Sequence, residues 1–258
     1  MEDEKVIDDL VVLGRAGPEP ISDGRKTVCL GGYSPTEGFV RLYPTQRRMT
    51  QCRRWNVVSI PVVSVPEHDD RDESYKISGS KEDWEYLHRK IEKVGRLGQE
   101  QRIELVHELA QDCPAVLNDN KVSLGVVEPA EIKDFWLKPT DSDTVQAELT
   151  GEKRQGKTDY PQKLYLRYRC EGCEQKTPHE QHCIEWGIYK YWDSNDDPEG
   201  VFDALRLTDD DYKHYFFVGN LNHHRTAYIV ISIFRFKKSE LLECGVSIDE
   251  QPHLGEFM

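Results

Sequence analysis

The stretch RCEGCEQKTPHEQHCIEW, residues 169–186, decides the fold of the second half of the chain because it concentrates residues that bind transition metals. Cys170 and Cys173 form a C-x-x-C knuckle directly after an apolar segment, and His179 and Cys183 follow within ten residues of it. In a chain without a disulfide framework, thiols and imidazoles at such spacing indicate a metal site. The next question is which of these side chains can reach one ion.

The residues after the knuckle predict the start of a helix. Thr177 is a favourable N-cap, Pro178 suits the first turn, and Glu180 completes a capping box with Thr177. On such a helix His179 and Cys183 would be neighbours four residues apart and would point the same way. The sequence therefore predicts a closed tetrahedral site that holds a structural zinc ion. Its predicted ligands are Cys170, Cys173, His179 and Cys183.

Other arrangements of the cluster remain open at this stage. His182 is a competing ligand, although a helix would turn it about 100° away from Cys183. An iron–sulfur cluster could use the three clustered thiols with a distant one, Cys29 or Cys52. The cysteines could also be unligated thiols beside a surface histidine. If only three residues bound the metal, Glu185 could act as a base, as a carboxylate does in zinc hydrolases.

The composition sets limits on partners and location. The 258 residues carry a formal net charge of −13 and seven cysteines. A chain with this much negative charge repels nucleic acid at long range. Any binding must therefore come from a local basic patch. No apolar run reaches the roughly 18 residues of a membrane helix, and the acidic start of the sequence lacks the pattern of a secretion signal. We expect a cytoplasmic protein that does not associate with membranes.

Apolar periodicity predicts a β-rich α+β fold. Strands are expected at residues 5–14, 26–44, 53–65, 122–138 and 163–170, with a long hairpin at 215–238. Helices are expected at residues 81–95 and 100–110, and again after the knuckle. The polar segment from residue 139 to about 160 separates two halves. We therefore expect an N-terminal domain, residues 1–139, with a two-helix insertion, and a C-terminal domain, residues 140–258, with the metal knuckle.

Two stretches are candidates for nucleic-acid binding. The segment RLYPTQRRMTQCRRW, residues 41–55, interleaves arginines with aromatic side chains, the combination that single-strand binders use for phosphates and bases. The tip of the predicted hairpin, near residues 219–228, presents further polar groups. Alternatively the arginines pair with surface carboxylates and the tip is a solvated turn, or His223 or His224 acts as an acid or base. The candidate contacts are Arg41, Tyr43, Arg47, Arg48, Arg53, Arg54, Trp55, Asn220, His223 and Arg225.

Several short motifs resemble a family of uncharacterised prokaryotic proteins with dual OB-containing domains. The motifs are VCLGGYSPTEGFVRLYP, SLGVVEP, YLRYRCEGC and FFVGNLNHHRTAYIVISIF. The resemblance implies two OB-like β-barrels and an association with defence or mobile genes. It places the family's metal motif on Cys170, Cys173 and His179. It also places the cysteine of the family's early strand at Cys29, which competes with Cys183 to complete the site.

Together these observations predict a protein that binds nucleic acid, single strands in particular, and contains a structural zinc site. Two alternatives share the same scaffold. One is a nuclease or nucleotide-modifying enzyme centred on Glu185, His223 or His224. The other is an acidic subunit that engages a basic protein partner within a larger complex.

Overall fold

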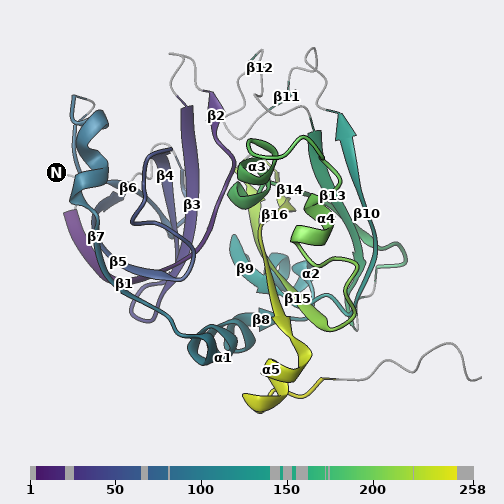
Figure 1. Ribbon diagram of the computed structural model, residues 1–258. Helices are drawn as coiled ribbons and strands as arrows, with labels where there is room; N and C mark the ends of the chain where they lie inside the picture. The colour runs from purple at the N-terminus through teal and green to yellow at the C-terminus, as the bar shows by residue number, and fades with distance from the viewer. Residues whose placement is uncertain are drawn as a thin grey trace, which may run out of the picture.

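The computed structural model contains a β-barrel and a second, open sheet that lie side by side (Figure 1). It describes residues 4–20, 26–64, 69–80, 82–139, 146–147, 153–154, 162–171, 173, 175–222 and 224–248. The β-rich class predicted from the sequence is confirmed. None of the helices in this described part of the chain is both long and apolar enough to span a membrane.

The first half of the chain forms a closed five-stranded barrel with the order β1-β3-β4-β6-β5, in which β5 pairs back onto β1. All pairs in this ring are antiparallel except the parallel pair β4–β6. Two short strands, β2 and β7, extend the sheet from β3 and β5. The bounds are β1 Glu4–Arg15, β2 Glu19–Pro20, β3 Lys26–Ser34, β4 Gly38–Gln46, β5 Asn56–Ser64, β6 Ser74–Ile77 and β7 Glu92–Arg96.

The barrel closes around an aliphatic core that its own strands supply. Val and Ile alternate along β5 and suit a strand with one buried face. Val58, Ile60 and Val62 of this strand are all fully buried. The β3–β4 hairpin turns at Gly38, whose φ of 78° is a left-handed conformation that glycine adopts without a steric penalty. The interior of the barrel is therefore filled by side chains.

The second sheet contains seven strands in the order β10-β13-β14-β16-β15-β9-β8. Its centre is the long antiparallel hairpin β15–β16, which was predicted from the sequence, and β14 pairs parallel to β16. A separate two-stranded ladder, β11 Gln146–Ala147 with β12 Lys153–Arg154, completes the strands. The sheet's bounds are β8 Ala110–Gln111, β9 Leu124–Val127, β10 Glu131–Pro139, β13 Gln162–Arg169, β14 His179–Cys183, β15 Tyr212–Leu221 and β16 His224–Lys237.

The predicted domain boundary between residues 139 and 140 falls inside the second sheet. The strand β10, which ends at Pro139, pairs with β13 along its whole length, and β9 pairs with β15. Strands from before the boundary are thus built into the same sheet as strands from after it. The change from barrel to second sheet comes earlier, around α1 Gln99–Leu109, which connects β7 to β8.

Helices are few and short. Besides α1, the chain contains α2 Pro114–Asp119, α3 Trp186–Trp192, α4 Val201–Ala204 and α5 Lys238–Glu243. The prediction of a helix at residues 81–95 is wrong over most of this segment. The segment contains a short 3-10 helix, η1 Trp84–Lys90, followed by the strand β7. Glycine at position 95 and β-branched Val94 are poor helix formers, and pairing of β7 with β5 takes over this segment.

The helix expected to begin at residue 177 is also wrong, because His179–Cys183 is the strand β14. Pairing with β13 on one side and β16 on the other overrides the capping signal. Along β14 the side chains of Gln181 and Cys183 are buried and Glu180 is exposed, the alternation of a strand. The helix α3 begins only at Trp186.

Each half has an apolar core of its own, and a further apolar core lies between the barrel and the second sheet. In it Val11, Leu13 and Trp55 of the barrel half pack with Phe217 and Phe234 of the hairpin β15–β16. Small residues allow this close approach, since a Cβ on Gly14 would lie 2.9 Å from the Cβ of Ser232. The two halves therefore form one packed structure (Figure 1).

Candidate metal centre and cationic pocket

Four side chains from three separate segments meet beside the end of β13. Cys170 directly follows β13, Cys173 lies in the connection to β14, and His179 is the first residue of β14. The fourth side chain is Cys113, the N-cap residue of α2, where its Sγ accepts a hydrogen bond from the backbone N–H of Ala115 at 3.4 Å. The start of α2 therefore holds Cys113 next to the knuckle.

The candidate ligand atoms of this group lie close to one another. The Cys113 Sγ lies 3.3 Å from the His179 Nε2 and 3.4 Å from the Cys173 Sγ, and the Cys173 Sγ lies 3.4 Å from the same Nε2. One ligand atom each from Cys113, Cys170 and His179 lie within 4.8 Å of one another. Tetrahedral zinc bond lengths put ligand atoms about 3.5–3.8 Å apart. Cys113, Cys170 and His179 thus form a group that could hold a metal ion.

Burial controls the protonation of this cluster. It raises the pKa of the Cys170 thiol, and negative charge on Cys113, Cys173 and Asp112 raises that pKa further. Burial likewise raises the pKa of Cys113 and lowers the pKa of His179. Burial therefore favours the neutral imidazole of His179, the form that binds a metal, whereas the thiols of Cys113 and Cys170 need a nearby cation before they ionise. A divalent ion would supply that positive charge.

Three of the four predicted ligands, Cys170, Cys173 and His179, lie in this cluster, and Cys183 does not. On the strand β14 Cys183 stands four residues from His179, which is about 13 Å along an extended chain. It is buried in the strand pairing, opposite Leu164 and Val230. The prediction for Cys183 depended on a helix, and a strand removes the i, i+4 proximity.

The competing ligands also lie elsewhere. The His182 ring stacks on Tyr165, with ring centroids 5.3 Å apart. Cys29 lies on β3 and packs against the core shared by the two halves, and Cys52 is buried in the barrel core. Sequence reasoning missed Cys113, which stands 57 residues before Cys170 and belongs to no spacing motif. Its only local signal is Pro114, which marks a helix start and makes Cys113 the N-cap.

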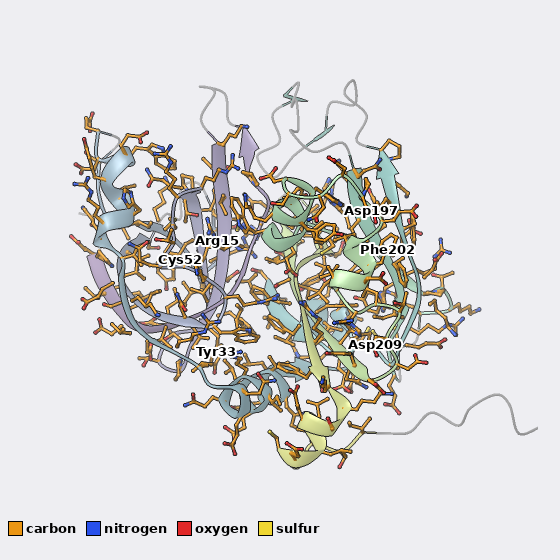
Figure 2. The ribbon with its side chains drawn as sticks, in the orientation of Figure 1. Arg15, Tyr33, Cys52, Asp197, Phe202 and Asp209 are labelled. Atoms are coloured by element: carbon orange, nitrogen blue, oxygen red, sulfur yellow. The ribbon has the colours of Figure 1, made fainter. Side chains whose placement is uncertain are left out.

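A second candidate site is a pocket of about 420 Å³ where the barrel meets the second sheet. The barrel contributes the end of β1 and the loop after β4, and the other half contributes the start of α3 and one residue of β16. We name it the cationic pocket. Its lining residues are Gly14, Arg15, Arg47, Met49, Thr50, Cys52, Arg53, Arg54, Glu185, Trp186, Gly187, Lys190 and Ser232. Arg15 and Cys52 are labelled in the barrel half of Figure 2.

An ion pair across the two halves forms the floor of the cationic pocket. The Nη1 of Arg54 lies 3.2 Å from a carboxylate oxygen of Glu185 and also donates to the Ser232 hydroxyl at 2.8 Å. Glu185 is buried, and its other carboxylate oxygen accepts a hydrogen bond from the backbone N–H of Ile233 at 2.6 Å. The carboxylate is therefore fully engaged in structure, which argues against Glu185 as a base.

The wall of the pocket combines an aromatic ring with cations. The guanidinium carbon of Arg15 lies 4.6 Å from the ring centroid of Trp186, and that of Arg47 lies 5.9 Å from it. Arg15 also donates to backbone carbonyls of the loop after β4, including that of Arg47 at 3.0 Å. Such cation–π contacts orient the half-buried indole of Trp186 between barrel and second sheet.

Several predicted nucleic-acid contacts stabilise the fold instead. Arg41 is buried and donates to the backbone carbonyl and the hydroxyl of Ser123. Trp55 is only 8% exposed and packs on Phe234, with ring centroids 4.8 Å apart. Neither side chain is presented to a ligand at the surface. Both side chains contribute to packing between the barrel and the second sheet.

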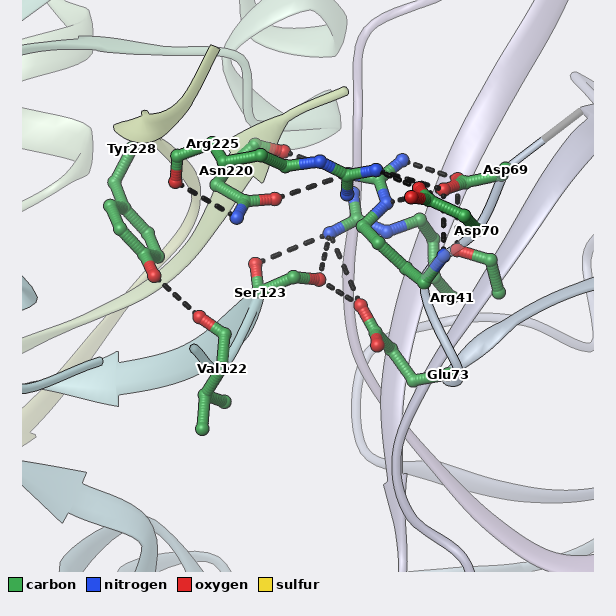
Figure 3. Close-up of polar contacts among 11 residues, drawn as sticks. Arg41, Asp69, Asp70, Glu73, Val122, Ser123, Asn220, Arg225 and Tyr228 are labelled. Carbon is green, nitrogen blue, oxygen red and sulfur yellow. Dashed lines mark hydrogen bonds and ion pairs between the residues drawn. The ribbon is translucent and has the colours of Figure 1, made fainter. Parts of the chain in front are cut away.

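The hairpin tip is tied to the barrel by polar contacts (Figure 3). Asn220 is buried, accepts from Arg71 at 3.2 Å and donates to the carbonyl of Arg225 at 3.0 Å. The guanidinium of Arg225 contacts the carboxylate of Asp70 and lies 4.0 Å from that of Asp69. His223 lies outside the described residues. The tip is thus engaged by the loop before β6.

The remaining candidates divide between pocket and surface. Arg47, Arg53 and Arg54 line the cationic pocket. Arg48 belongs to the same loop, is exposed and is not part of the lining. Tyr43 lines a smaller neighbouring cavity. Sequence reasoning missed Arg15, Trp186 and Lys190, whose role depends on how the barrel meets α3.

These features define a β-rich protein with a closed barrel, a second sheet and a Cys/His group that could hold a metal ion. Residues 7–108 match the model of a family described as a domain of unknown function (DUF8758). This match covers the barrel and most of α1, and it confirms the coarser part of the predicted resemblance, an uncharacterised family. The prokaryotic origin and the paired OB domains stay predictions. No curated protein matches the chain.

Proposed function

We propose that this protein binds single-stranded nucleic acid in the cationic pocket and that its Cys/His group holds a structural zinc ion. One observation carries the proposal: five cationic side chains and an aromatic ring line one pocket in a chain whose net charge is −13. In proteins that bind single strands, cationic side chains bind the phosphates and aromatic rings stack on the bases. The acidic remainder of the surface limits binding to this place.

The barrel supports this proposal by its architecture. A closed five-stranded barrel whose order departs from the sequence order, with one parallel pair, has the connectivity expected of an OB-like Greek-key barrel. OB folds are frequent binders of oligonucleotides, and this analogy concerns fold alone. The second sheet gives no such support, because no pairing joins β10 to β8 within the described strands. We restrict the OB-like architecture to the barrel.

Zinc is the metal that suits the donor set. Cys113, Cys170, Cys173 and His179 offer three sulfurs and one nitrogen, a set typical of four-coordinate structural zinc. Four protein ligands leave no open position for water, so the ion would stabilise structure and not catalyse a reaction. Elemental analysis of the purified protein tests this assignment. About one zinc per chain is expected. Iron together with visible absorption would instead show that the site holds an iron–sulfur cluster.

Fluorescence anisotropy tests the binding function. The measurement uses labelled single-stranded and duplex oligonucleotides across a range of salt concentrations. Single strands are expected to bind more tightly, with a logarithmic salt slope of about −0.7 for each phosphate contact. Removing one contact, with Arg53→Ala or Lys190→Ala, is expected to make that slope shallower by about this amount.

Arg48→Ala is the matched control, since Arg48 is exposed on the same loop but lies outside the lining. It removes the same charge and is expected to leave binding almost unchanged. If no oligonucleotide bound even at low salt, the nucleic-acid function would be rejected. Equal losses for Arg48→Ala and Arg53→Ala would place binding outside the pocket.

A further inference from the structure

The cationic side chains of the pocket differ in whether a carboxylate of the protein already pairs with them. Arg54 is neutralised by Glu185, and Arg47 and Lys190 share a single carboxylate oxygen of Asp193 at 3.4 and 3.1 Å. The exposed guanidinium of Arg53 makes no hydrogen bond or ion pair with any described residue. Five cationic side chains thus face two carboxylates, which leaves positive charge for a ligand with more than one negative charge.

Buried and exposed residues both line the pocket. Gly14 of β1 lies directly against Ser232 of β16, and a Cβ on Gly14 would come within 2.9 Å of the Cβ of Ser232. Beside this contact the Arg54 side chain is fixed by Ser232 and by the carbonyl of Ile233 at 3.0 Å. Arg47 and Arg53 are exposed, so a ligand can reach these two cations from solvent.

The remaining wall suits a flat ring. Trp186 is half-buried, and Met49 and Cys52 of the same lining are almost completely buried. Burial raises the pKa of Cys52 to about 12, so its thiol stays neutral and adds no negative charge. The volume of about 420 Å³ lies within the range of small-ligand pockets, roughly 300–1,000 Å³, and has room for a single nucleotide unit.

We propose that the cationic pocket recognises a phosphate monoester on a nucleoside: the phosphate lies between Arg47, Arg53 and Lys190, and the base lies against Trp186. The inference rests on the nucleic-acid-binding function proposed above and names the group that the pocket recognises. A phosphate monoester carries a charge of about −1.5 to −2 at pH 7, whereas a phosphodiester within a strand carries about −1. The extra charge matches the surplus of cations in the pocket.

The same chemistry is offered by two sources, a phosphorylated strand end and a free nucleotide. Anisotropy of a labelled 12-nucleotide single strand is measured with a hydroxyl or a phosphate at the unlabelled end, for each of the two ends. A terminal phosphate is expected to lower the Kd about tenfold or more, because its second negative charge strengthens the hydrogen bonds from the cationic side chains. Isothermal titration with AMP and with adenosine measures the free nucleotide directly, and AMP is expected to bind more tightly by a similar factor.

Arg53→Ala is expected to remove the advantage of the phosphate, and Arg48→Ala to keep it. If strands bound equally with phosphate and hydroxyl ends, and AMP bound no better than adenosine, the inference would be overturned while the nucleic-acid function stood. If AMP bound better than adenosine, with dependence on Arg53, but no strand bound, the free nucleotide would be the ligand. In that case the inference would stand and the nucleic-acid function would fail.

Discussion

The barrel and the second sheet have cores of different chemistry. Among the described residues, the fully buried part of the barrel core consists of aliphatic side chains with Met49 and Cys52, and Tyr75 and Trp84 pack against it from its edge. The core of the second sheet contains the aromatic rings of Tyr168, Phe216 and Tyr228 and a group of cysteines. Each strand of the barrel ring also pairs with a neighbouring strand on both sides, whereas β10 and β8 are the edge strands of the second sheet.

This difference explains where a metal would be useful. A closed barrel leaves few unpaired strand edges, and its hydrogen bonds and aliphatic core stabilise it together. In the second half, the start of α2 and the β13–β14 connection are short segments without a strand partner of their own. A metal bound by Cys113, Cys170, Cys173 and His179 would crosslink them. We therefore expect the second sheet, and not the barrel, to depend on the metal.

The largest effect is expected from removing a metal ligand. Cys170→Ser should lower the metal content and reduce the free energy of unfolding by more than about 4 kcal/mol, since loss of a structural metal is among the costliest changes. Hydrogen exchange measured by mass spectrometry should show lost protection in β13 and β14 and retained protection in β4 and β5. Chelation of the metal should reproduce the same pattern in the unmodified protein.

Cys183→Ala is the control for this comparison. Cys183 is fully buried in the same core but lies outside the cluster. Its loss should cost about 1–2 kcal/mol of packing and leave the metal content unchanged. Equal metal loss in both variants would return Cys183 to the ligand set, and uniform loss of protection in barrel and sheet would contradict the proposed division.

A smaller effect is expected from the barrel core. Ile60→Ala should reduce the free energy of unfolding by about 3 kcal/mol, because Ile60 is completely buried and truncation leaves a cavity. The metal content should stay as in the unmodified protein, as measured by elemental analysis. Val6→Ala, at a side chain that is 55% exposed on the neighbouring strand, should change stability by less than about 0.5 kcal/mol. Metal loss in Ile60→Ala would show that the halves are coupled more tightly than their cores indicate.

Much of the fold can be predicted from the sequence where the pattern is local. The alternating residues of β5 and the hairpins β3–β4 and β15–β16 carry signals within about 25 residues. The closure of β5 onto β1 and the pairing of β14 with β16 join distant segments. The local capping signal at Thr177 predicts a helix for the segment that follows. The segment is a strand, because its pairing with neighbouring strands outweighs that signal.

The candidate site shows the same limit. The C-x-x-C knuckle and His179 can be recognised by spacing, since they lie within ten residues. Cys113 reaches them only because β8 and β9 place α2 beside the knuckle, which no spacing encodes. The arginines of residues 41–55 look equivalent in sequence, yet Arg41 is buried and Arg53 is exposed. Burial decides which of them can bind a ligand, and burial depends on the complete fold.

The smallest expected effect is the pH dependence that His182 gives the second sheet. Within the described part of the chain, its buried Nε2 has no hydrogen-bond partner. Burial, and then the positive charge of Lys163, lowers the pKa of His182 from 6.5 to about 4. As the pH falls below 6.5, the unfolded state therefore takes up a proton before the folded state does, and stability is lost between about pH 6.5 and pH 4.

His182→Phe tests this expectation, because the ring can still stack on Tyr165 but no longer titrates. Denaturant unfolding between pH 7.5 and pH 5.5 should show a flatter pH dependence in this variant, by at most about 1.4 kcal/mol per pH unit. His107→Gln, at an exposed position of α1, should leave the slope unchanged. Metal content is measured at each pH, so that acid release of the ion is separated from the histidine. A slope equal to that of the unmodified protein would mean that His182 takes up its proton at the same pH in the folded and unfolded states, and burial would then not lower its pKa.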